Sequence, residues 1–81
     1  MSKKKVIITR HAEERAIQRG VSIEEIKETI DKPTQKTPIK GKVQEFRRTT
    51  NKGINIVIAE IKGNDLIIIT TWWENGKSTK N

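Results

Sequence analysis

The chain has 81 residues, one histidine and no cysteine, and its 17 Lys and Arg outnumber its 10 Asp and Glu to give a net charge of +7. A chain of this length can form one small hydrophobic core. The absence of cysteine excludes disulfide frameworks, zinc fingers and iron–sulfur sites, and a single histidine excludes a His-rich metal cluster. No apolar run exceeds four residues, too few to span a bilayer, so we expect a cytoplasmic protein. We also expect that it needs no cofactor or metal, and its positive net charge predicts a polyanionic partner.

The positive charge is unevenly distributed along the chain. Residues 1–20 carry a net charge of +4 and residues 36–53 carry +5, whereas residues 21–35 carry −2 and residues 54–81 are balanced. If the fold brings the two basic segments together, they form one electropositive face suited to a nucleic acid. The alternative is that scattered lysines merely keep a small protein soluble.

A short strand and a helix are predicted at the start of the chain. Val6 to Ile8 is an apolar run with strand character, and Thr9 after it is a favourable N-cap. A helix is therefore expected from Arg10 to Arg19, ending at Gly20, a residue that readily takes the left-handed conformation found after helices. Only alanines face the core from this helix, so it can pack closely.

The second helix has a clear start and a clear end. Ser22 and Glu25 form a capping box, an apolar stripe follows, and Pro33 ends the helix. Residues 34–41 are predicted to form a connection, because a proline and a glycine interrupt them.

The remaining chain is predicted to form strands. Residues 43–49 mix charged and apolar residues as an edge strand does, and residues 54–61 and 66–73 are rich in β-branched residues, as central strands are. Residues 62–65 supply a hairpin loop between these two strands. In that register one face carries Ile54, Ile56, Ile58, Glu60, Ile67, Ile69, Thr71 and Trp73.

The predicted order is β-α-α-β-β-β. This is an α+β domain over residues 1–74, with two helices packed on one face of a largely antiparallel sheet. A flexible tail is expected over residues 75–81, which are rich in Gly, Ser, Thr and Lys.

The first helix carries the candidate for acid–base chemistry. His11 is the one side chain that titrates near neutral pH without special help, and Arg15 and Arg19 follow it at successive turns. A proton carrier beside fixed cations suits cleavage of an RNA phosphodiester, with His11 as general acid or base and Arg15 binding the scissile phosphate. Because the nucleophile is internal to RNA, no metal is required. A lone histidine in the first turn of a helix is, alternatively, an ordinary surface residue.

Further candidates for nucleic-acid binding lie on the strands. Arg47 and Arg48 are adjacent, so they point to opposite faces and at most one can join His11, while Lys42 shares a face with Arg48. The residue pattern does not choose between the two arginines, and Arg19 is expected to position the RNA backbone with one of them.

The aromatic residues and one glutamate complete the candidates. Trp72 and Trp73 also point to opposite faces, so one packs in the core and the other can stack on a base; we assign Trp73 to the site and keep Trp72 as the alternative. Glu60 is an acid inside an apolar strand, which makes it a candidate base or arginine partner, or else a solvated strand-end residue.

The segment from Thr9 to Ser22 resembles a small bacterial and archaeal domain-of-unknown-function family marked by a His-Ala-x-x-Arg-x-x-x-Arg-Gly helix, to which His11, Arg15 and Arg19 correspond. That family is similar in element order to RelE-like and BrnT-like toxins of the barnase, EndoU, colicin and RelE ribonuclease fold. The resemblance implies a metal-independent endoribonuclease that a protein antitoxin neutralises. The chain departs from active relatives of that fold because it has no tyrosine and no second histidine.

Three functions therefore stand as hypotheses. The leading one is a toxin-like RNA-binding domain that cleaves RNA through His11. The second is a non-catalytic nucleic-acid-binding module that uses the same basic residues. The third is a protein-interaction module that adds a partner strand at the edge formed by residues 43–49 or offers its open sheet face to a dimer mate.

Overall fold

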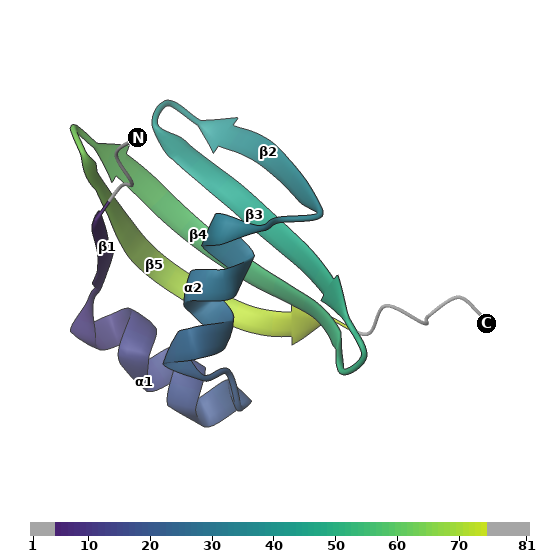
Figure 1. Cartoon of the computed structure of the whole chain (residues 1–81). Coiled ribbons are helices and arrows are strands. Elements are labelled where there is room, and N and C mark those ends of the chain that lie inside the picture. Colours follow the sequence, from purple (N-terminus) through teal and green to yellow (C-terminus); the bar gives the residue numbers. More distant parts are fainter. Residues whose placement is uncertain (1–4, 75–81) are drawn as a thin grey trace.

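Two helices lie against one face of a five-stranded sheet (Figure 1). The computed structural model describes residues 5–74, so the predicted tail over residues 75–81 lies outside the described residues. The elements are β1 (Lys5–Ile8), α1 (Arg10–Arg19), α2 (Ile23–Asp31), β2 (Gln35–Lys40), β3 (Val43–Thr50), β4 (Gly53–Lys62) and β5 (Asp65–Glu74). The strand order is β1-β5-β4-β3-β2, with β1 parallel to β5 and every other pair antiparallel. The predicted α+β class and the single helical layer are confirmed.

One element was missed by the sequence interpretation. Residues 35–40 form strand β2, which pairs antiparallel with β3, so the predicted connection over residues 34–41 is wrong and residues 43–49 form an inner strand. Pro38 is tolerated because β2 is an edge strand, and Gly41, with φ +57°, lies in the turn between β2 and β3. A partner therefore cannot add a strand beside residues 43–49, because β2 and β4 occupy both edges of that strand.

For local reasons α1 begins and ends at the expected residues and α2 begins at the expected one, while α2 ends at Asp31, two residues before Pro33. The Thr9 hydroxyl accepts the backbone N–H of Ala12 at 3.1 Å, and Gly20 closes α1 with φ +70°. Ser22 and Glu25 form both hydrogen bonds of the predicted capping box at the start of α2.

The core lies between the helices and the sheet. Ala12 and Ala16 of α1 are fully buried, and the absence of longer side chains there lets the helix approach β5 closely. Ile26 of α2 packs with apolar side chains of the three inner strands. Three polar side chains are buried with them, and these are Thr29, Asn55 and Thr71.

A bulge in the β4–β5 pair changes which side chains face the helices. From the hairpin up to the pair of Ala59 with Ile68 the register is the predicted one, but the next pair is Ile58 with Thr70, so Ile69 is an extra residue in β5. An extra residue reverses the alternation of every side chain beyond it. Thr70 therefore lies on the uncovered face, and Thr71 lies on the helix-covered face.

No helix within residues 5–74 is long and apolar enough to cross a membrane.

Candidate functional site

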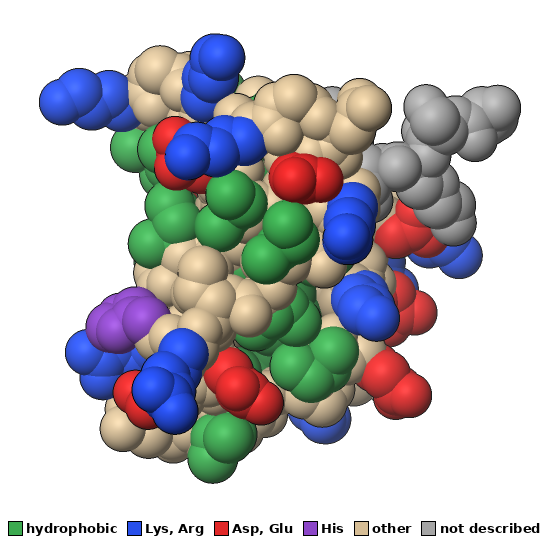
Figure 2. All heavy atoms as spheres, turned by 90° about the vertical axis from the view of Figure 1, so that its left-hand side faces the viewer, with side chains coloured by type: hydrophobic (Ala, Val, Ile, Leu, Met, Phe, Trp, Pro, Cys, Tyr) green, Lys and Arg blue, Asp and Glu red, His purple; other side chains and the backbone are tan. Residues whose placement is uncertain are grey.

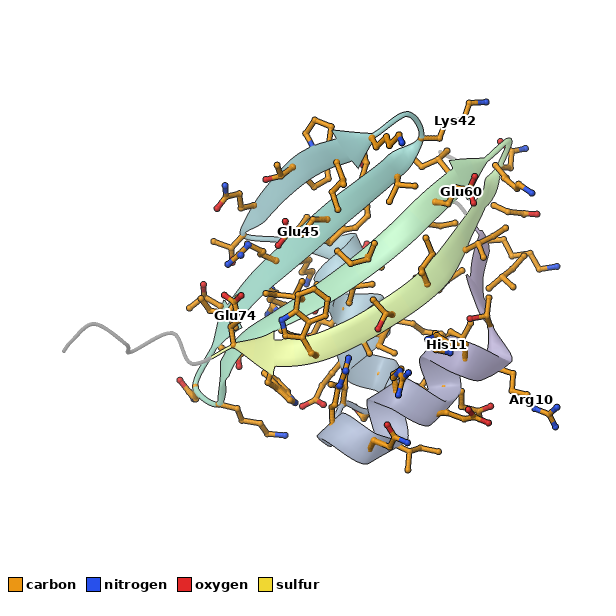
Figure 3. The ribbon with its side chains drawn as sticks, turned by 180° about the vertical axis from the view of Figure 1, so that it is seen from behind. Arg10, His11, Lys42, Glu45, Glu60 and Glu74 are labelled. Atoms are coloured by element: carbon orange, nitrogen blue, oxygen red, sulfur yellow. The ribbon has the colours of Figure 1, made fainter. Side chains whose placement is uncertain are left out.

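Three side chains of α1 point the same way because they occupy successive helical turns. These are His11, Arg15 and Arg19, which we call the α1 basic row. The start of the helix is tied to β5, since the Thr9 hydroxyl donates to the carbonyl oxygen of Ile68 at 2.9 Å. Seen from the uncovered face of the sheet, His11 lies beside the border of α1 and β5 (Figure 3). The row therefore runs along one edge of that face.

Arg19 is the member of the row that β5 holds in place. Its Nη1 donates to the carbonyl oxygen of Thr71 at 3.2 Å and to Oγ1 of Thr70 at 3.5 Å. Arg19, Thr70 and Trp72 line a shallow hollow at the edge of the uncovered face. A guanidinium, a hydroxyl and an indole ring thus meet at one place on the surface.

Arg15 and His11 extend the row away from this hollow. Arg15 Nη1 donates to Oε1 of Gln18 at 3.2 Å. His11 is exposed, and within residues 5–74 its side chain has neither a hydrogen bond nor an ion pair. Arg19 lies eight positions after His11, which corresponds to about 12 Å along the helix axis. The structure brings His11 and Arg15 to the same edge as the hollow but leaves His11 outside it.

The two tryptophans lie on opposite faces, as predicted, but Trp72 rather than Trp73 lies on the uncovered face. Trp73 packs against the core below the helices, and its Nε1 donates to the carbonyl oxygen of Gly20 at 3.2 Å. Trp72 lies on the uncovered face, opposite Ile56 of β4. The bulge at Ile69 causes the exchange, so the stacking candidate is Trp72 and the assignment of Trp73 to the site is corrected.

Arg47 is on the uncovered face but its charge is already compensated. Its Nε lies 2.9 Å from a carboxylate oxygen of Glu45, and its Nη1 lies 3.2 Å from one of Glu74. Partial burial acts to lower the pKa of Arg47, but the two carboxylates outweigh that effect and raise the pKa above its usual value. Arg47 links β3 to the end of β5 and is separated from the α1 basic row.

Arg48 and Lys42 are also placed away from the row. Arg48 lies on the opposite face from Arg47, where its Nη1 donates to the carbonyl oxygen of Lys32 at 2.8 Å and so caps the C-terminal end of α2. Lys42 is exposed at the turn between β2 and β3, on the far side of the sheet from α1 (Figure 3). These two residues and Arg47 do not join His11 in one cleft.

The uncovered face of the sheet is not uniformly basic. It carries Glu45, Glu60 and Glu74 (Figure 3), of which Glu60 has no ion pair among residues 5–74. Glu60 is therefore not the partner of an arginine within the described residues. The carboxylates that pair with Arg47 are those of Glu45 and Glu74. The two basic segments of the sequence do not merge into one electropositive face, and the positive charge at the site comes from α1 alone.

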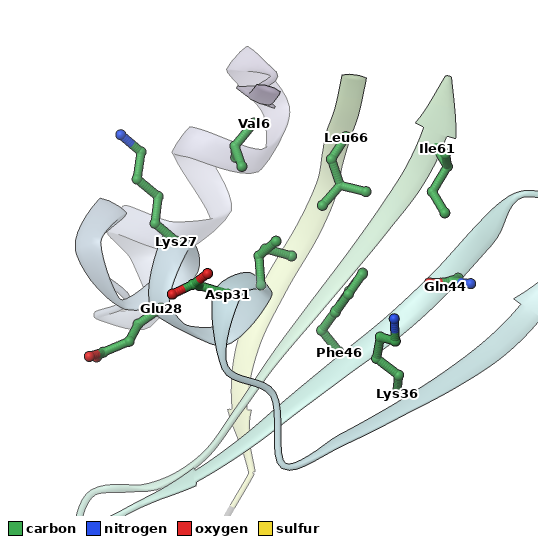
Figure 4. A pocket seen from close by; sticks show the side chains of 10 residues that line it. Val6, Lys27, Glu28, Asp31, Lys36, Gln44, Phe46, Ile61 and Leu66 are labelled. Carbon is green, nitrogen blue, oxygen red and sulfur yellow. The ribbon is translucent and has the colours of Figure 1, made fainter. Parts of the chain in front are cut away.

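A second hollow lies on the helix-covered side. This groove of about 530 Å³ lies between α2 and the sheet (Figure 4). Its lining is mainly apolar, with charged side chains of α2 and β2 at its margins, and comprises Val6, Lys27, Glu28, Ile30, Asp31, Lys36, Gln44, Phe46, Ile61 and Leu66. Among residues 5–74 no three His, Cys, Asp or Glu side chains are grouped so that they could hold a metal ion.

The sequence interpretation kept Trp72 only as the alternative to Trp73, and it did not foresee the hydrogen bonds by which β5 holds Arg19. Thr70 and Thr71 could bind phosphate but are also common strand residues, and the hydrogen bond of Arg19 to the Thr71 carbonyl carries no sequence signal. The run of two tryptophans after two threonines was the available indication that one face of this strand end is exposed to solvent.

Comparison with known proteins places the chain in a family. A model described as "Domain of unknown function (DUF4258)" matches residues 8–73, which include both helices, β2 to β4 and the α1 basic row. The chain belongs to this family. The DUF4258 domain thus covers most of the described fold. The chain matches no curated protein and no solved structure at a significant level.

Proposed function

We propose that this DUF4258 domain binds single-stranded RNA along the α1 basic row, with one base stacked on Trp72. The observation that carries the proposal is the hollow of Arg19, Thr70 and Trp72, where a guanidinium fixed by β5 lies beside an indole ring. A fixed cation and an aromatic platform are the two elements with which proteins bind unpaired nucleotides.

The charge distribution supports a path along the helix. The ion pairs found within residues 5–74 involve Arg47 and Lys52 but none of His11, Arg15 and Arg19, so the arginines of the row are uncompensated cations. Successive members lie about 6 Å apart along the helix, a spacing suited to successive phosphates of one strand. The glutamates of the sheet repel phosphate, so the strand follows the α1 edge rather than crossing the sheet.

Cleavage through His11 is the alternative form of the same proposal. His11 is one turn from Arg15, so a phosphate held by Arg15 lies within reach of the imidazole, as RNA cleavage with an internal nucleophile requires. The relationship to RelE-like and BrnT-like toxins belongs to this form. It rests on the His11 to Gly20 motif and on the α+β element order, and it predicts a protein antitoxin as a second partner.

The binding test uses a labelled single-stranded RNA oligonucleotide at low salt, with matched arginine variants. Arg15→Gln and Arg19→Gln should each weaken binding and lower the slope of log K against log salt by about 0.7 for each phosphate that the variant no longer neutralises. Arg10→Gln is the matched control, because it removes the same charge from the same helix at a position pointing away from the sheet (Figure 3). Equal losses of affinity in all three variants would show that only net charge matters and would contradict the proposal.

Stacking is tested by fluorescence. Trp73→Phe leaves Trp72 as the only tryptophan, so quenching of the remaining emission by RNA reports on Trp72 alone. Trp72→Ala should reduce the binding free energy by roughly 1–3 kcal/mol, the range for one base stacked on an aromatic ring. Unchanged emission in Trp73→Phe together with unchanged affinity in Trp72→Ala would exclude stacking.

Cleavage is assayed on the same RNA without added metal, using wild type and His11→Ala. Loss of cleavage with binding retained in His11→Ala supports the catalytic form. Binding without cleavage in both proteins supports the non-catalytic module.

A further inference from the structure

We propose that the uncovered sheet face is the interface of a homodimer, in which a second copy packs on an apolar patch made by β1, β4 and β5. Ile7 and Ile67 are aligned neighbours on β1 and β5, and Ile58 and Ile69 lie beside the bulge. We call these four residues the isoleucine patch. None belongs to the core below the helices, and Ile69 is 37% exposed.

Ile69 is exposed, and the other three isoleucines of the patch are half-buried beside it. Figure 2 looks onto the side that holds β1 and α1, so the uncovered face is seen edge-on, and hydrophobic side chains lie above the histidine at that edge. Exposed apolar clusters of this kind on small domains mark interaction sites more often than scattered apolar residues do. A partner that covers the patch removes its apolar surface from water, which favours association.

The charges on the two sides of the patch identify the partner as a second copy. On the β5 side lie the cations of the α1 basic row, and on the β4 side lies the carboxylate of Glu60, which has no ion pair within residues 5–74, whereas Glu45 of β3 is already paired with Arg47. A two-fold axis that lies in the interface over the patch, parallel to the strands, sets the two uncovered faces against each other and places the positive side of each copy over the negative side of the other. Such self-complementarity is what an isologous interface requires.

The size of the face is sufficient for such an interface. Five strands of about eight residues make a face of roughly 24 by 26 Å, from the usual strand spacing and rise. With side-chain relief this supplies much of the about 800 Å² that each partner of a standard stable interface buries. The proposal does not depend on RNA binding. Because Arg15 contributes to both surfaces, RNA and the second copy compete, and the test is done without RNA.

The test measures the mass of the full chain in solution from micromolar to millimolar concentration, by sedimentation equilibrium. Wild type should approach twice the 9.3 kDa of one chain as concentration rises. Ile69→Asp should raise the dimer dissociation constant about ten-fold or more, as expected when a charge is placed in an interface centre. Ile17→Asp is the matched control, because Ile17 is 74% exposed on α1 and outside the patch, and it should leave the constant unchanged.

A charge exchange tests the two-fold arrangement and does not depend on the stability of Ile69→Asp. Arg15→Glu and Glu60→Arg should each weaken the dimer, and the two together should restore it, because each copy then presents the opposite pattern of charge. A single-chain mass throughout the concentration range overturns the proposal. So do equal effects of Ile69→Asp and Ile17→Asp, masses that grow beyond the dimer, or a double variant weaker than both single variants.

Discussion

The buried hydrogen bond between Thr29 of α2 and Asn55 of β4 should be a large contributor to stability, and a double-mutant cycle can measure it. The Thr29 hydroxyl donates to Oδ1 of Asn55 at 2.7 Å, and both side chains are almost completely buried. Asn55 Nδ2 in turn donates to Thr71 Oγ1 at 3.3 Å and to the carbonyl oxygen of Trp72 at 3.2 Å. Every polar atom of the Asn55 side chain is therefore used.

The magnitude follows from which groups lose their partners. Thr29→Val keeps the shape but leaves the buried Asn55 Oδ1 without a donor, which costs about 1–3 kcal/mol. Asn55→Leu removes three hydrogen bonds and leaves the Thr29 hydroxyl and the Trp72 carbonyl without these partners, so we expect about 2–4 kcal/mol. The double variant should cost about 1–2 kcal/mol less than the sum of the two single costs, because neither polar group of the Thr29–Asn55 pair is then left buried without the other.

Urea denaturation followed by tryptophan fluorescence gives the three free energies of unfolding. The losses are a substantial fraction of the roughly 4–12 kcal/mol of stability expected for a chain of this length, so each variant should show a clearly lower midpoint with an unchanged slope. Additive effects within about 0.3 kcal/mol would refute the reasoning, since they would mean that water or another group replaces each missing partner.

Three further predictions concern single side chains. Glu25→Gln, which keeps the capping box but removes the charge paired with Lys52 at 2.8 Å, should cost about 0.5 kcal/mol at pH 7, a small value because the pair is exposed to solvent. Gly53→Ala should cost roughly 1–3 kcal/mol, because Gly53 has φ +133° and a Cβ there would lie 2.7 Å from the carbonyl oxygen of Glu74. Thr9→Val should cost about 1–2 kcal/mol through loss of the α1 N-cap, whereas Thr9→Ser should cost much less. Urea denaturation measures all three.

The Glu25 prediction also has a defined pH dependence. Hydrogen bonds from Lys52 and from the Ser22 backbone N–H lower the pKa of Glu25 below its usual value. A lowered folded-state pKa gives stability that is present above the unfolded-state pKa and is lost as pH falls through the folded-state pKa. The gap in stability between wild type and Glu25→Gln should therefore be constant above about pH 5.5 and close in acid. A gap that stays the same in acid, where Glu25 is protonated, would contradict the assigned cause.

Controls for the other two variants come from the same chain. Gly63→Ala also forces a positive φ, but at +62°, which alanine can adopt, and its Cβ would have no neighbour within 4 Å, so its excess stability over Gly53→Ala measures the clash together with the greater backbone strain at φ +133°. Equal costs at both glycines would argue against the clash. If Thr9→Ser proves as costly as Thr9→Val, the hydroxyl is not what fixes the start of α1.

The sequence was sufficient wherever structure is determined by neighbours along the chain. Thr9, Gly20 and the Ser22 capping box act within one helical turn, so α1 and the start of α2 could be placed to the residue. Strand β2 could not be recognised, because an edge strand of polar residues with a proline has no alternating pattern of its own and depends on β3 for its conformation.

The candidate site was only half predictable for a similar reason. The α1 basic row follows from helical spacing, but the orientation of Trp72 depends on a bulge, which is a property of two paired strands. The ties of Arg47 to Glu74 and of Arg48 to Lys32 could not be predicted, because these partners are distant in sequence; only the second partner of Arg47, Glu45, is a near neighbour along the chain. An arginine count therefore overestimated the charge available for RNA.

The pairing of β1 with β5 has a consequence for synthesis of the protein. Residues 5–8 lie beside residues 65–68, and the hydrogen bonds of Thr9 and Arg19 to β5 span 59 and 52 positions. Residues 5–20 are made before β5, and contacts of such long range close slowly. A nascent chain that still lacks β5 thus carries the cations of α1 without the hollow, and the complete site forms only after β5 has been made.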